Sequence, residues 1–109
     1  MTTTALSTGS QTATISTEHT LDTITTAGVL LLSVDINAMV ANDVMELRIY
    51  GKARTGDTER LLFKGSYGPI VSPLTLVQST PIVSPHYTRF TLKQTAGTGR
   101  SYPWAIYAV

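Results

Sequence analysis

Apolar and polar side chains alternate with a period of two residues along most of this 109-residue chain. In "VMELRIYGK" the apolar residues from Met45 to Ile49 are separated by Glu and Arg, and "YTRFTLKQ" repeats the pattern. In "RLLFKGSYG" the alternation places Leu61, Phe63 and Tyr67 on one side. Because successive side chains of a strand point to opposite faces, each stretch predicts a strand with one buried face and one wet face.

Two further stretches are apolar on both faces. "GVLLLSVDI" has a continuous apolar middle, and in the last expected strand Trp104 and Ile106 alternate with Tyr107 and Val109. Strands that are buried on both sides have this kind of sequence. We therefore expect both faces of each of these strands to be covered.

Prolines divide the middle of the chain. "GPIVSPLTLVQSTPIVSPHY" contains "PIVSP" twice, at Pro69–Pro73 and at Pro81–Pro85. Because proline cannot donate to a strand ladder, only short edge strands are expected here, and we interpret the two copies as matching corners of a long hairpin. Seven or eight short strands without a helix predict an all-β fold, an antiparallel β-sandwich with jelly-roll topology as the leading option.

The stretch "TAGTGRS" resembles a glycine-rich phosphate-binding loop at first sight. A Walker loop needs Lys followed by Ser or Thr after its second Gly, whereas Arg100 and Ser101 follow Gly99. A dinucleotide-binding loop needs a third Gly and a helix, which Pro103 would interrupt. We interpret the stretch as a turn between two strands, with glycines that supply positive φ angles.

The first 17 residues, "MTTTALSTGSQTATIST", are uncharged and rich in Thr, Ser and Ala. Alone, such a segment cannot bury enough apolar surface to offset its ordering entropy. We therefore divide the chain into an extended N-terminal arm, residues 1–17, and a single β-sandwich domain, residues 18–109. The arm is expected to add a strand to the sheet edge of a neighbouring chain, and the alternative is that it folds back on its own domain.

Four residues of the arm are the predicted partner contacts. Leu6 and Ile15 are its apolar anchors, each contributing about 1.5 to 3 kcal/mol when fully buried, and Thr12 and Thr14 belong to its pairing segment. Deletion of residues 2–17 is expected to leave the sandwich folded, because nearly all of the expected core follows Val29. The same deletion is expected to weaken partner binding at least about tenfold.

Groups for catalysis and metal binding are scarce. The chain has no Cys and two His, and it lacks the G-x-S-x-G and H-E-x-x-H motifs. His19, beside Glu18, has no second ligand at a recognisable spacing. Asp35, Asp43 and Asp57 stand beside turns, where Asp commonly caps backbone N–H groups, and a calcium site built from them is the alternative. The sequence predicts no catalytic, cofactor-binding or metal-binding residue, and no enzyme.

The sequence also bears on membranes and nucleic acid. The longest apolar run, Ala27–Val34, is shorter than the ~20 residues of a bilayer span, and no basic residue precedes His19, so we expect a soluble chain without a targeting segment. Acids predominate up to Leu47 and bases from Arg60 onward, but the bases do not cluster with aromatics as in nucleic-acid binders. A lightly charged surface that meets protein subunits fits better, with three predicted surface contacts, Arg89, Lys93 and Arg100.

The aromatic residues near the end allow two interpretations. Tyr102, Trp104 and Tyr107 could form a sugar-stacking platform of the kind that carbohydrate-binding sandwiches carry. Alternation places Tyr102 and Trp104 on one face and Tyr107 on the other, which argues against a single platform. Core packing or subunit contact is the favoured interpretation.

The stretches "TITTAGVLLLSVDINAMVANDVMELRIYGK" and "FTLKQTAGTGRSYPWAIY" resemble segments of small virion proteins of tailed bacteriophages. In those proteins a Thr-rich start leads to a "T-A-G-V" strand, an "N-D-x-x-E-L-R" strand and a closing "L-K-Q-T-A-G-T-G-R" hairpin. The resemblance covers roughly Thr20 to Tyr107, and the Pro-rich middle matches least well. Its motifs are structural rather than chemical.

The resemblance implies a non-enzymatic head decoration or cement protein of the virion, made in the host cytoplasm, which binds the outer surface of the capsid shell and stabilises it. The implied partners are the major capsid protein and further copies of the chain, with a trimer favoured. One alternative is a structural protein of the tail, the head-tail junction or a fibre base. Another is a carbohydrate-binding module that uses Tyr102 and Trp104.

Overall fold

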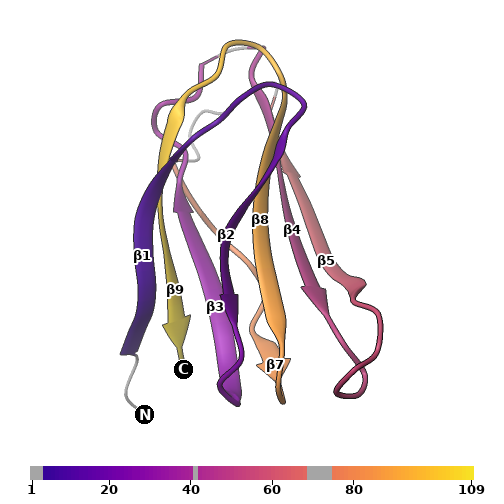
Figure 1. Ribbon diagram of the computed structural model, residues 1–109. Helices are drawn as coiled ribbons and strands as arrows, with labels where there is room; N and C mark the ends of the chain where they lie inside the picture. Colours follow the sequence, from indigo (N-terminus) through magenta and orange to yellow (C-terminus); the bar gives the residue numbers. More distant parts are fainter. Residues whose placement is uncertain (1–3, 41, 69–74) are drawn as a thin grey trace.

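The computed structural model describes residues 4–40, 42–68 and 75–109. Figure 1 shows these residues as strands joined by turns, and they contain no helix long and apolar enough to cross a membrane. The nine strands found there are β1 (Thr4–Thr12), β2 (Glu18–Ile24), β3 (Gly28–Asp35), β4 (Val44–Gly51), β5 (Arg60–Tyr67), β6 (Leu76–Gln78), β7 (Ile82–Ser84), β8 (Thr88–Ala96) and β9 (Ser101–Ala108).

The strands form two antiparallel sheets, which pack face to face as a sandwich (Figure 1). Sheet A has the order β1-β9-β3, and the short strands β6 and β7 both pair with the other side of β3. Sheet B has the order β2-β8-β4-β5. The prediction of an all-β antiparallel sandwich is confirmed.

The strand pairs are nested along the sequence. β4 pairs with β5, β3 with β6 and β7, β2 with β8, and β1 with β9. This order is that of one long hairpin folded over into two sheets, and the jelly-roll topology expected from the sequence stays a prediction. The second "PIVSP" holds β7, which is as short as the prolines predict. The first, Pro69–Pro73, lies outside the described residues.

The core lies between the two sheets and comes from the alternating positions. β4 follows the alternation along its whole length, with every second residue buried. In β8, Phe90 and Leu92 point inward as predicted and are fully buried. In β9, Tyr102 and Ile106 are fully buried and Trp104 packs against the core. The prediction that these three side chains share the inner face is therefore confirmed.

In β5 the predicted facing holds for Phe63 and Tyr67, which pack against the core, and is wrong for Leu61. A bulge in the β4–β5 pairing sets Phe63 opposite Ile49 but Leu61 opposite Tyr50. Because an extra residue moves the following side chains to the other face, Leu61 does not join Phe63 and is 51% exposed. The alternation of one strand cannot show a bulge, which depends on its partner.

The predicted arm needs a larger correction. Its residues 4–12 are strand β1, which pairs with β9 from Thr4 opposite Ala108 to Thr12 opposite Ser101. For these residues the structure follows the alternative, an arm folded back on its own domain. The physical reason is that β9 has a free edge, whose backbone groups pair with a segment that has little apolar surface of its own.

The stretch "TAGTGRS" forms the turn from β8 to β9, as predicted. Gly97 has a φ of 87°, the left-handed conformation expected of a turn glycine. Gly99 has a different role, because a Cβ atom there would lie 2.3 Å from the carbonyl oxygen of Ala13. Ala13 is buried, and its N–H donates to the carbonyl oxygen of Arg100 at 2.8 Å. The turn therefore holds the chain that leaves β1.

Candidate functional site

The outer face of sheet A is the side that points away from sheet B. Leu30, Leu32 and Val34 of β3 point into the core, so the residues that alternate with them, and their partners across the ladder, point outward. This outer face comprises Ala5, Thr8, Ser10, Thr12, Val29, Leu31, Ser33, Asp35, Leu76, Gln78, Val83, Ser101, Pro103, Ala105 and Tyr107. Asp35 is the one charged residue in this set.

A shallow groove of about 410 Å³ crosses this face, with six lining residues, Leu31, Ser33, Leu76, Gln78, Tyr107 and Val109. Leu76 is 56% exposed, and Val83, beyond the groove, is 74% exposed. We expected both faces of β3 and β9 to be covered, but the described part of the chain leaves this outer face open. Its exposed apolar side chains, Leu76 and Val83, make this face a candidate interaction site.

The charge of Asp35 is used within the chain. Its Oδ1 accepts the N–H of Asn37 at 2.9 Å, so it caps the turn after β3, as predicted. Asp35, at the end of β3, is therefore the one charge that the defined residues of this outer face offer a partner.

The outer face of sheet B is charged, and most of its charges pair with one another. Arg48 donates to Glu46 at 3.0 Å and lies 3.9 Å from Glu18. Lys64 lies 3.4 Å from Glu46. This network joins β2, β4 and β5 across the sheet.

The pKa of Glu18 shows that this network stabilises the ionised form of its carboxylate. Burial alone would raise the pKa of Glu18, but hydrogen bonds from Thr91 and Tyr50 and the charge of Arg48 outweigh it, so the pKa is lowered. The two hydroxyl donors each lie 2.6 Å from its Oε2. The carboxylate is satisfied internally.

A second cluster surrounds Glu59. Arg89 donates to it through Nη2 at 2.6 Å and through Nε at 3.1 Å, and Tyr87 donates its hydroxyl at 2.6 Å. Hydrogen bonds from Arg89 and Tyr87 hold the pKa of Glu59 below its usual value. The guanidinium of Arg89 also lies 4.5 Å from the ring centre of Tyr50.

The three basic residues predicted as surface contacts differ in their surroundings. Arg89 is held by Glu59, and Arg100 by Asp43 at 3.1 Å. Lys93 forms no ion pair in the described part of the chain. The roles of all three as contacts stay predictions, and neutralisation within the chain makes Arg89 and Arg100 weaker candidates. Such pairing also explains why the acidic first half and the basic second half coexist on one small surface.

The four predicted partner contacts of the arm lie at or near the surface. Leu6, at a bulge in β1, is 41% exposed, and Ile15, at the corner before β2, is 37% exposed. The hydroxyl of Thr12 lies 2.8 Å from that of Ser101, and the N–H of Thr14 donates to His19. Their role in partner binding stays a prediction.

Asp43 is the most buried carboxylate described. Its oxygens accept the N–H groups of Val40 at 3.0 Å and Thr98 at 3.1 Å, and Nε of Arg100 at 3.1 Å. The glycine-rich turn does therefore hold an anion, which is this side chain. The sequence predicted Asp43 as a cap, but the spacing gave no sign that it would reach a turn 55 residues away.

Asp57 lies in an ion pair with Arg54 rather than on a backbone N–H group. No three side chains among the described His, Asp and Glu residues lie close enough to hold a metal ion.

The aromatic residues do not form a shared exposed platform. Tyr102 is fully buried and donates its hydroxyl to Oε1 of Gln94 at 2.8 Å. Burial raises its pKa to about 12. Trp104 lies under β1, where a Cβ atom on Gly9 would come within 2.9 Å of its ring. Tyr102 is enclosed in the core, and Trp104 is partly buried against it.

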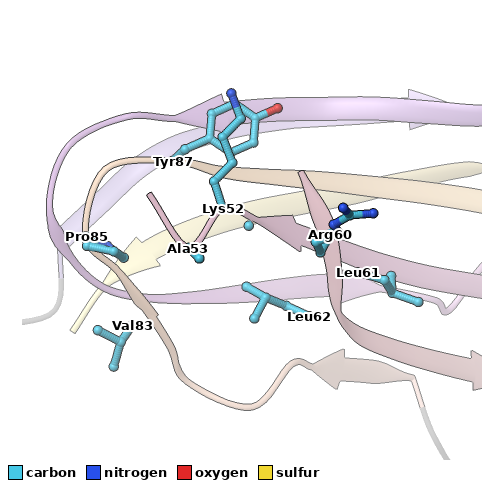
Figure 2. Close-up of a pocket in the computed structure, with 9 residues that line it drawn as sticks. Lys52, Ala53, Arg60, Leu61, Leu62, Val83, Pro85 and Tyr87 are labelled. Atoms are coloured by element: carbon cyan, nitrogen blue, oxygen red, sulfur yellow. The ribbon is translucent and has the colours of Figure 1, made fainter. Parts of the chain in front are cut away.

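A second groove, of about 270 Å³, lies where β5 of sheet B approaches β7 of sheet A. Figure 2 shows Leu62 and Val83 on its two sides, with Lys52 beside the ring of Tyr87. The Lys52 ammonium lies 4.3 Å from that ring centre. The lining has apolar walls and two cations, Lys52 and Arg60, but no carboxylate or histidine. The groove is smaller than the ~300 Å³ at which ligand pockets begin and lacks an acid–base pair.

Comparisons of the chain with protein-family models, with curated proteins and with solved structures find no match. The outer face of sheet A is therefore the leading candidate site on physical grounds. The sequence feature that pointed to this face was the apolar character of β3 and β9 on both of their faces. The neighbouring contributions of β1, β6 and β7 could not be assigned before the pairing was known.

Proposed function

We propose that the chain is a non-enzymatic structural protein that lies flat on a protein shell through the outer face of sheet A. The observation that carries the proposal is the contrast between its two faces. The outer face of sheet B pairs most of its charges, whereas that of sheet A is open, has Asp35 as its one charge, and is apolar at its centre. A protein partner covers the apolar centre of such a face without having to desolvate ions.

The resemblance to virion proteins of tailed phages suggests which shell this is, namely that of the major capsid protein, with the chain acting as a decoration or cement protein on the virion. Jelly rolls occur in viral capsid and lectin domains, which agrees with the proposal, although one fold serves many functions. A protein that binds the assembled shell and not its separate subunits stabilises the shell by mass action, by about 2.7 kcal/mol per site at a free concentration 100 times the Kd.

The test uses two substitutions on the outer face of sheet A, Leu76→Lys and Tyr107→Lys. Each places an ammonium group in the apolar contact, where it loses water without gaining a partner. We expect each variant to bind stripped capsid shells at least about tenfold more weakly in co-sedimentation, a change of about 1.4 kcal/mol.

Ser66→Lys is the matched control, because Ser66 is exposed on β5 and lies opposite Glu46 on sheet B. It should bind like the unsubstituted chain, and circular dichroism should show all three variants folded. Binding that is unchanged in both sheet A variants would overturn the proposed docking face. A tail or junction location is distinguished by copy number, which should be a few to some dozens per particle there and hundreds on a capsid.

A further inference from the structure

Strand β1 forms one edge of sheet A. Its inner neighbour is β9, and no described strand pairs with its other side (Figure 1). Alternate backbone N–H and C=O groups of an edge strand point outward, where they can pair with a further strand. Seven of the nine residues of β1 are exposed.

The other sheet edges carry charges or are very short, whereas the one feature of β1 that discourages pairing is its bulge at Leu6. β2 carries Glu18 and Asp22, β5 carries Arg60 and Lys64, and β6 and β7 have three residues each. β1, "TALSTGSQT", has no charge and no proline over nine residues. At about 3.4 Å per residue it presents an open edge about 30 Å long. Charges, prolines, bulges and short lengths are the devices that normally protect such edges, and β1 has only the bulge.

We propose that β1 binds the β1 strand of a second copy of this chain, in an antiparallel pair about a two-fold axis. A strand that pairs with itself places its own residues opposite one another, so any charge would meet a like charge. β1 is free of this penalty. When the outer faces of both copies point the same way, Thr8, Ser10 and Thr12 of one copy lie opposite the same group of hydroxyl residues in the other. A bulge at Leu6 interrupts the regular ladder, so we place the two-fold axis at Ser10, where Ser10 lies opposite its own copy and Thr8 lies opposite Thr12.

The protection of the other sheet edges also limits how many copies can join. Because the other described edges are protected, the contact is isologous and closes at two copies rather than continuing into a fibre. This pairing gives a dimer, in place of the trimer that the resemblance implied. It would also join two outer faces of sheet A into one surface whose one charge per copy is Asp35. The use of that joined surface for docking alone rests on the proposed function.

Sedimentation equilibrium of the purified full chain, without capsid shells, tests the pairing. A single pair of edge strands buries less than the ~1,200 Å² of a standard interface, so we expect a weak monomer–dimer equilibrium with a Kd on the order of 10 to 100 μM. Ser10→Lys places an ammonium group directly opposite the same group of the other copy and should raise the Kd about fivefold. Thr8→Lys places its ammonium group opposite Thr12 and should raise the Kd by a smaller factor.

Ser66→Lys again serves as the control and should leave the Kd unchanged, with thermal unfolding confirming that the variants are folded. A monomer up to about 500 μM, a trimer, or a dimer that both edge variants leave intact would overturn the pairing. A chain that stays monomeric but binds shells disproves only the pairing. A chain that dimerises but binds no shell disproves only the proposed function.

Discussion

Removal of residues 2–17 is expected to cost the chain about 5 kcal/mol of stability or more, which is comparable to the total stability of many domains of this size. The deletion removes β1, leaves β9 without a neighbour on one side, and takes Ala13 out of the core. It also uncovers Trp104, which β1 covers at Gly9. Since burial of a large aromatic side chain dominates the energetics around it, the remaining sandwich should be largely unfolded at 25 °C.

The measurement is urea unfolding followed by circular dichroism. Deletion of residues 2–3, which ends before β1 begins, is the control and should unfold like the full chain. A cooperative transition of the longer deletion close to that of the full chain would mean that β1 is dispensable. That outcome would restore the expectation drawn from the sequence, in which residues 2–17 served only partner binding.

Replacement of Asp43 by Ala is expected to lower the free energy of unfolding by about 3 kcal/mol. The side chain is 2% exposed, and its loss leaves the N–H groups of Val40 and Thr98 and the Arg100 guanidinium without their acceptor. Unpaired buried donors are costly, although Arg100, at 31% exposure, can regain some water.

Asp57→Ala is the control for this substitution. It removes an ion pair with Arg54, whose side chain is 84% exposed, and should change stability by less than about 0.5 kcal/mol. Denaturant unfolding of the two variants side by side gives the comparison. Equal, small losses would show that the contacts of Asp43 with the turn contribute little.

The Asp43 contribution should also depend on pH. Burial alone would raise its pKa, but the hydrogen bonds from Val40, Thr98 and Arg100 outweigh burial and lower it. A carboxyl group with a lowered pKa in the folded state stabilises the fold above its unfolded value of about 3.9, and this stabilisation is lost as the pH falls through the folded value. The stability difference between the unsubstituted chain and Asp43→Asn should therefore be full at pH 7 and shrink below about pH 4. A difference that stays constant from pH 7 to pH 3 would contradict this.

Local alternation predicted the sandwich because a strand shows its two faces in its own sequence. The burial of Phe90 and Leu92 could be read in this way, as could the opposite facing of Trp104 and Tyr107. The position of β1 could not be predicted in this way, because β1 has few apolar residues and is held by hydrogen bonds to the backbone of β9. The bulge that turns Leu61 outward likewise belongs to a strand pair and not to one strand.

The sequence predicted only part of the candidate site, because it shows the faces of single strands and not the pairing between strands. The apolar second faces of β3 and β9 predicted that something covers them, but the sequence could not say whether this was the chain itself. For the basic residues, the sequence suggested charges free to meet a partner, whereas the fold pairs two of them with acids. Arg89 and Arg100 lack acidic neighbours in the sequence, yet the fold brings Glu59 and Asp43 to them, and ion pairing over such separations leaves no local pattern.

The nested order of the strand pairs also has a consequence for the time course of folding. The connection between β4 and β5 is short, whereas Thr12 and Ser101, which face each other in the outermost pair, are 89 positions apart. Loop-closure entropy grows with the length of chain enclosed, and distant pairings slow folding, so the pairs should form from the β4–β5 hairpin outward. β1 leaves the ribosome first but receives its partner last. The strand with the least protected edge thus waits longest before it is paired, which makes the nascent chain, rather than the finished protein, the state most exposed to misassembly.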